Sequence, residues 1–82
     1  MGYSNAQFFR VGGNRYLRYS LDRSARVSVR IYDMQGRLQA KVFDAVPAQG
    51  VHTITLPADL SQSLHLLEFR TGAQSEWHTI YP

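Results

Sequence analysis

The amino-acid sequence predicts an all-β domain, built as a seven-stranded antiparallel sandwich. Three observations lead to this prediction. Apolar and polar residues alternate with a period of two through most of the chain, as they do in half-buried strands. Turn signals that contain glycine or proline recur about every 8 to 12 residues, which is typical of sandwiches. No segment of helical length carries the spacing of an amphipathic helix.

The clearest strand pair lies within residues 25–44. One face of the first strand, residues 25–33, carries three β-branched residues: Val27, Val29 and Ile31. A tight turn follows at Asp33-Met34-Gln35-Gly36, because aspartate accepts hydrogen bonds from nearby backbone and glycine takes a positive φ. The returning strand, residues 37–44, is predicted to point three residues inward: Leu38, Ala40 and Val42. Asp33 and Gly36 are therefore predicted structural turn residues.

The other strands are predicted at residues 7–11, 15–21, 51–56, 64–70 and 75–81. Turns are predicted at Gly12-Gly13-Asn14, Pro47-Ala48-Gln49-Gly50 and Thr71-Gly72-Ala73-Gln74, and Pro57-Ala58-Asp59-Leu60-Ser61 is predicted to be a loop, with Gly50 a third structural turn residue. The predicted core is Val27, Val29, Ile31, Leu38, Val42, Ile54, Leu56, Leu67 and Phe69. Seven short strands joined in this way predict an immunoglobulin-like sandwich over residues 7–82. Residues 1–6 are predicted to be a linker or a start added for expression.

The charge distribution divides the chain in two. The formal net charge is +3, and eight of the nine basic side chains lie in the first half: Arg10, Arg15, Arg18, Arg23, Arg26, Arg30, Arg37 and Lys41. One interpretation is a basic face for nucleic acid, anionic lipid or acidic glycan. The other is that these side chains are the solvated faces of strands, partly paired with acids of the second half. Their spacing along strands, without a continuous run, favours the second interpretation.

The chemistry-bearing residues predict neither an enzyme nor a cofactor site. The chain has no cysteine, and His52, His65 and His78 lack a second histidine at metal-ligand spacing. Serine, histidine and aspartate occur without a recognisable catalytic context. Gly12-Gly13 is too short for a phosphate loop. No apolar run reaches the roughly 20 residues of a membrane span. We therefore expect no catalytic, cofactor-binding or metal site.

Three segments carry a resemblance to a known family: Tyr19-Ser20-Leu21 with the strand and turn of residues 25–38, the Gly50 strand of residues 47–56, and residues 60–69. Together they resemble the C-terminal sorting domain of the type IX secretion system, found on proteins exported by gliding and related Gram-negative bacteria. Ser63 and His65 stand where that family usually has glycine and tyrosine. The resemblance covers about three quarters of the chain and implies an immunoglobulin-like fold.

The resemblance implies a non-catalytic module that directs a larger cargo protein across the bacterial outer membrane, for secretion or cell-surface attachment. Its partners would be the outer-membrane secretion machinery and an upstream catalytic or adhesive domain of the same parent chain. Its route would be periplasmic transit, then the cell surface or the extracellular space. The family's signal lies in the last hairpin, so the candidate recognition residues are Leu64, His65, Leu66, Glu68, Trp77, Ile80 and Tyr81.

The alternation of the last two strands sorts these residues by face. His65, Leu67 and Phe69 are predicted to point into the core, together with Trp77, Thr79 and Tyr81. Leu64, Leu66 and Ile80 are then predicted to be partly exposed. Such an apolar patch is a candidate docking site, and the alternative is that an upstream domain covers it.

A second function left open by the sequence is an immunoglobulin-like or fibronectin-type accessory module of an extracellular glycan-degrading enzyme, with a structural role or with polysaccharide as a ligand. Platforms for glycans use exposed aromatic side chains, and the candidates are Tyr3, Phe8, Phe9, Tyr16, Tyr32, Trp77 and Tyr81. Most of these are expected to be buried or scattered, which predicts no strong glycan binding.

Overall fold

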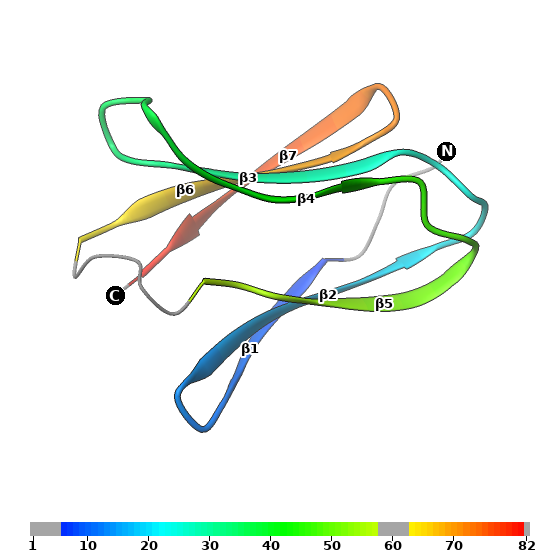
Figure 1. The fold of residues 1–82 in the computed structure, drawn as a ribbon, viewed down its shortest axis with the longest axis horizontal. Coiled ribbons are helices and arrows are strands. Elements are labelled where there is room, and N and C mark those ends of the chain that lie inside the picture. Colours follow the sequence, from blue (N-terminus) through cyan, green and yellow to red (C-terminus); the bar gives the residue numbers. More distant parts are fainter. Residues whose placement is uncertain (1–5, 58–62, 82) are drawn as a thin grey trace.

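The computed structural model describes residues 6–57 and 63–81, in which every regular element is a β-strand. Seven strands follow one another along the chain (Figure 1): β1 (Gln7–Val11), β2 (Asn14–Leu21), β3 (Val27–Tyr32), β4 (Leu38–Ala45), β5 (Gly50–Thr55), β6 (His65–Thr71) and β7 (Gln74–Ile80). Each lies within about two residues of its predicted position, so the predicted all-β class and strand count are confirmed. No helix that could cross a membrane occurs in the described segments.

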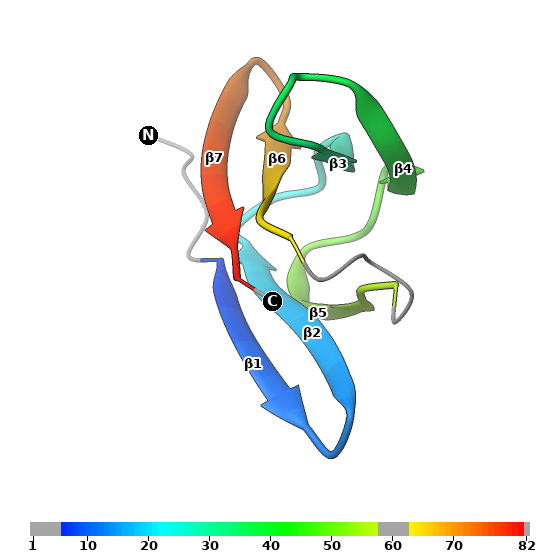
Figure 2. The same ribbon diagram turned by 90° about the vertical axis from the view of Figure 1, so that its left-hand side faces the viewer.

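The strands form two antiparallel sheets that face each other. The smaller sheet has the order β1-β2-β5, and the larger has the order β4-β3-β6-β7. Figure 2 shows the two layers edge-on, with β1 and β7 on the same side of the molecule. The β1–β2 hairpin projects beyond the larger sheet in both views (Figures 1 and 2). The chain is therefore a two-layer β-sandwich with β7 as one edge of its larger sheet.

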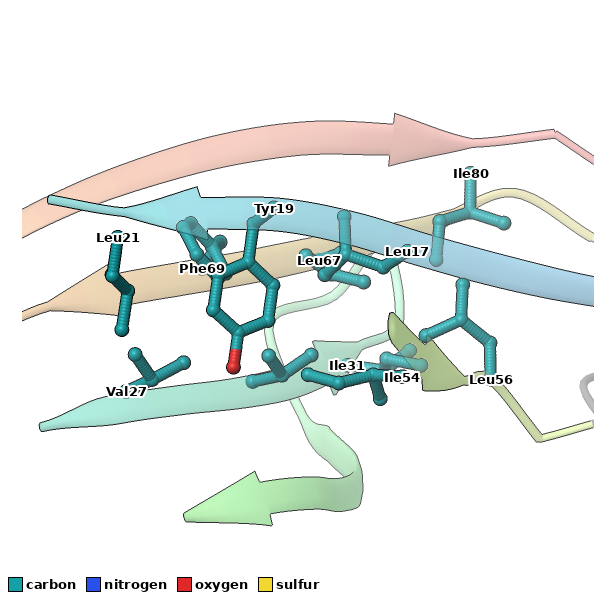
Figure 3. Close-up of a cluster of buried hydrophobic side chains, with 11 residues drawn as sticks. Leu17, Tyr19, Leu21, Val27, Ile31, Ile54, Leu56, Leu67, Phe69 and Ile80 are labelled. Carbon is teal, nitrogen blue, oxygen red and sulfur yellow. The ribbon is translucent and has the colours of Figure 1, made fainter. Parts of the chain in front are cut away.

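The core lies between the two layers and draws on both (Figure 3). Its buried apolar residues are Leu17, Tyr19, Leu21, Val27, Val29, Ile31, Ile54, Leu56, Leu67, Phe69 and Ile80. The ring centroids of Tyr19 and Phe69 lie 5.1 Å apart, which joins β2 to β6 across the layers. Burying one such side chain stabilises the fold by about 1.5–3 kcal/mol, so this cluster is the main source of stability.

Seven of the nine predicted core residues are buried. Val42 is partly buried and packs against the core cluster. Leu38 is 45 % exposed, so its placement in the core was wrong. The reason is the register of β4, which shifts against β3 between Val29 and Arg30 and again between Ile31 and Tyr32. Each shift adds a residue to one strand and changes the face on which the following side chains lie.

The predicted turn at Asp33 is confirmed in detail. Oδ1 of Asp33 accepts hydrogen bonds from the backbone N–H groups of Gln35 and Arg37, both at 2.9 Å. Gly36 has φ 85° and donates its N–H to the Asp33 carbonyl at 3.0 Å. Oδ2 accepts hydrogen bonds from Nε of Arg37 at 2.8 Å and from the Gln39 side chain at 3.1 Å. One carboxylate thus closes the hairpin between β3 and β4.

The side chains of β7 point to the opposite face of the sheet from the one predicted. Trp77 and Tyr81 are exposed by 54 % and 68 %, whereas Ile80 is only 6 % exposed and belongs to the core. The cause is the pairing with β6, in which Ile80 is opposite the core-facing His65 and Trp77 is opposite Glu68. Residues paired across two strands share a face. Trp77 therefore lies on the outer face.

Two earlier predictions fall outside the described residues. The aromatic Tyr3 precedes them, and most of the predicted loop at 57–61 lies between the two described segments. The predicted Gly50 turn is described: this glycine has φ 130° and begins β5.

Candidate functional site

The structure divides the seven candidate recognition residues into two groups. His65 and Ile80 are 4 % and 6 % exposed, so their side chains stabilise the fold and are not available at the surface. The accessible group consists of the half-buried Leu64, Leu66 and Glu68 and the exposed Trp77 and Tyr81. Leu66, Glu68 and Trp77 come together on the outer face of the larger sheet, because Leu66 pairs with Thr79 and Glu68 with Trp77.

Tyr32 joins this surface from the neighbouring strand β3. Its ring centroid lies 5.5 Å from that of Trp77, with an angle of 45° between the ring planes. Its hydroxyl donates a hydrogen bond to Oε1 of Glu68 at 3.3 Å. Since β6 lies between β3 and β7, the two rings meet above β6 and beside the Glu68 carboxylate. We call the three residues Tyr32, Glu68 and Trp77 the aromatic platform.

A cluster of cations lies on the same face, toward the other end of β3. A cavity of about 230 Å³ is lined by Arg26, Ser28, Arg30, Asp44, Arg70 and Gly72, and we call it the cationic notch. Arg26 binds Asp44 through two hydrogen bonds of 3.0 Å. The hydrogen bonds from Arg26 are the main cause that lowers the pKa of the Asp44 carboxyl. The positive charges of Arg26, Arg30 and Lys41 lower it further.

The pairing of Arg26 with Asp44 partly supports the view that first-half cations pair with second-half acids. Two arginines of the notch have no such partner. Among the described residues, Arg30 and Arg70 form neither an ion pair nor a side-chain hydrogen bond. The notch is therefore an electropositive hollow with free donors.

A second hollow, of about 260 Å³, lies where the β1–β2 hairpin meets the end of β7. Four of its nine lining residues are aromatic: Phe8, Phe9, Tyr16 and Tyr81. Phe8 also contacts His78 edge to face, with ring centroids 5.0 Å apart, which places β1 next to β7. Tyr81, the most exposed recognition candidate, thus belongs to this groove and not to the aromatic platform.

The three histidines have local contacts. His65 Nδ1 lies 3.1 Å from the Ser63 carbonyl oxygen, and His52 Nε2 lies 2.7 Å from that of Ala48. His78 Nε2 lies 3.1 Å from the Glu76 carboxylate. Across residues 6–57 and 63–81, no three histidine or acidic side chains converge in a way that could hold a metal ion.

A search against protein-family models and curated proteins found no match to the chain. The aromatic platform was not predictable from the residue pattern, because the contact between Tyr32 and Trp77 depends on the order β3-β6-β7. One signal was present: the two-residue turn at Gly72-Ala73 sets Glu68 opposite Trp77.

Proposed function

We propose that this domain is a non-catalytic sorting module, which directs a larger cargo protein across the bacterial outer membrane through the type IX secretion system. The observation that carries the proposal is the outer edge of β7, which has no neighbouring strand among residues 6–57 and 63–81 and is flanked by exposed aromatic side chains. It lies in the hairpin where the resembled family has its signal. The module would be exported through the periplasm and act at the cell surface or in the extracellular space.

The strand order supports an immunoglobulin-like assignment within the sandwich class. The chain changes sheets between β2 and β3, between β4 and β5, and between β5 and β6. The fourth strand pairs with the third, as in sandwiches of the fibronectin type III kind. Such sandwiches serve in many proteins as modules joined to other domains. This agrees with a partner domain upstream in the same parent chain.

The edge of β7 provides the means of recognition. An edge strand presents unpaired backbone N–H and C=O groups, to which an extended segment of a partner can add as a further strand. Trp77 and Tyr81 are exposed next to this edge and offer apolar contact area. Such a surface needs no catalytic group and no cofactor. It suits docking to a protein of the outer-membrane machinery.

The test is export of a reporter. Residues 7–82 are fused to a fluorescent protein with a periplasmic signal peptide, in a host that has the secretion machinery. Deletion of residues 64–82 should abolish surface display. That deletion also removes Leu67, Phe69 and Ile80 from the core, so it does not separate the signal from the fold. Point variants of exposed residues are needed.

We expect the double variant Trp77→Ala/Tyr81→Ala to accumulate in the periplasm while remaining folded. Val51→Ala is the control, because Val51 is 68 % exposed, as Tyr81 is, but lies on β5 of the smaller sheet. Normal export of the double variant would reject the proposed surface. A parent fusion that stays in the periplasm would reject the function as a whole.

A further inference from the structure

The aromatic platform and the cationic notch lie side by side on one sheet face. Arg70 follows Glu68 by two residues on β6 and pairs with Ser75, while Glu68 pairs with Trp77. Arg70 and Trp77 are therefore diagonal neighbours on the outer face, at a spacing of about 7–8 Å. A ligand with one ring on Trp77 would place the next unit of its chain at the notch. The platform and the notch therefore form one continuous surface.

The platform offers a flat, partly solvated apolar surface. Trp77 is 54 % exposed even though its ring contacts Tyr32, so its outer face is available. Flat aromatic rings bind the aliphatic C–H face of a sugar ring, because stacking buries apolar area on both sides. The Glu68 carboxylate beside the rings accepts hydrogen bonds at two oxygens, of which only Oε1 is used by Tyr32. Hydroxyl groups are the donors that fit this arrangement.

The notch selects for negative charge. Three arginines line it, Arg26, Arg30 and Arg70, against the single carboxylate of Asp44. Arg30 is paired with Lys41 on β4 and with Glu68 on β6. The planar guanidinium groups of Arg30 and Arg70 can bind a carboxylate through paired hydrogen bonds. The Ser28 side chain, 8 % exposed, lines the same cavity and adds a neutral hydroxyl. A ligand with one carboxylate next to a sugar face would satisfy both features.

We propose that this face binds an acidic polysaccharide, with a pyranose ring on Trp77 and the carboxylate of a neighbouring uronate in the cationic notch. Nucleic acid and acidic peptide fit less well. Neither the phosphodiester backbone of DNA nor an acidic side chain offers the hydroxyl donors that the Glu68 carboxylate can accept. This binding does not depend on the proposed export function.

The test uses the 82-residue chain and polygalacturonate as the probe, in affinity electrophoresis and calorimetry at low and raised salt. Hydroxyethylcellulose is the neutral probe, and polyglutamate and single-stranded DNA are the non-sugar polyanions. We expect binding to polygalacturonate alone, weakened by salt. Trp77→Ala and Arg70→Gln should each weaken it by about tenfold, the loss expected for one stacked ring or one charge-assisted hydrogen bond.

Two control variants match these changes elsewhere in the molecule. Phe9→Ala removes an exposed aromatic ring from the smaller sheet, and Arg23→Gln removes one exposed charge from the segment before β3. Both should bind polygalacturonate like the parent, and thermal unfolding should show all four variants folded. Equal binding of hydroxyethylcellulose would overturn the role of the notch. Equal binding of polyglutamate or DNA, absence of binding, or an undiminished affinity of Trp77→Ala would overturn the proposal.

Discussion

Two hairpins form the larger sheet, and they are built differently. The β3–β4 hairpin is closed by the Asp33 carboxylate and contains two register shifts. The β6–β7 hairpin has a continuous register from His65–Ile80 to Thr71–Gln74 and turns at Gly72-Ala73. In that second turn, the backbone N–H of Gly72 donates a hydrogen bond of 2.9 Å to the carbonyl of Arg26, in the segment before β3. The first hairpin is thus determined locally, and the second depends more on its packing against the rest of the fold.

The two hairpins should therefore respond to different perturbations. Local hydrogen bonds respond to pH and to turn substitutions. Tertiary packing responds to the removal of buried side chains, wherever they lie in the sequence.

The largest effect is expected from a core substitution in the second hairpin. Phe69 is fully buried against Tyr19, so Phe69→Ala should cost about 3–5 kcal/mol of unfolding free energy. Trp77→Ala, one strand away on the outer face, should cost less than about 1 kcal/mol. Urea denaturation of both variants measures the difference. Equal losses would contradict the assigned facing of β6 and β7.

A smaller effect is expected at the first turn. Gly36 has φ 85°, and a Cβ added there would meet no atom within 4 Å. The cost of Gly36→Val is therefore backbone strain without a clash, about 1–2 kcal/mol. Gly13→Ala is the matched control in another turn, because Gly13 does not have a positive φ and also has open space around it. If both variants unfold at the same denaturant concentration, the turn conformation is wrong.

An increase in stability is expected from Tyr19→Phe. The Tyr19 hydroxyl points toward β3 (Figure 3), is buried and has no hydrogen-bond partner within the described residues. Removing it relieves an unsatisfied polar group and should stabilise the fold by about 1 kcal/mol.

Burial also raises the pKa of Tyr19. The parent should therefore lose stability as the pH rises above about 10, the usual tyrosine pKa, and the variant should lose less. A variant less stable than the parent would reveal a partner for the hydroxyl.

The smallest effect is expected from acid, and it should be confined to the first hairpin. The backbone N–H of Arg37 is the main cause that lowers the pKa of Asp33, and the Arg26 hydrogen bond is the main cause for Asp44. Their stabilisation is present above the unfolded pKa of about 3.9 and is lost as the pH falls through the lower folded values. Amide exchange followed by NMR should show β3–β4 losing protection first, and Asp33→Asn should reduce the difference between the hairpins.

Much of the fold was predictable from the sequence, for a physical reason. Alternation locates strands, and the Asp33 turn is specified by residues adjacent in the chain. The facing of β7 was missed because Trp77 was expected to share the core face with His65, whereas the register places Ile80 opposite His65 and Trp77 opposite Glu68. Leu38 was missed because a bulge is not visible in the residue pattern. Leu17, Tyr19 and Leu21 were omitted from the predicted core, although β2 turned out to contribute all three. The aromatic platform and the cationic notch combine residues from several strands, so only tertiary structure reveals them.

The two edges of the larger sheet differ in a way that bears on self-association. The bulged edge strand β4 carries Lys41, and irregular, charged edges resist pairing with another chain. The opposite edge, β7, pairs regularly with β6 and has no such irregularity. The sheet can therefore be extended in one direction only. A second copy that pairs its own β7 with this edge closes a symmetric dimer and leaves no regular edge of the larger sheet open, so strand addition at this sheet stops at two copies.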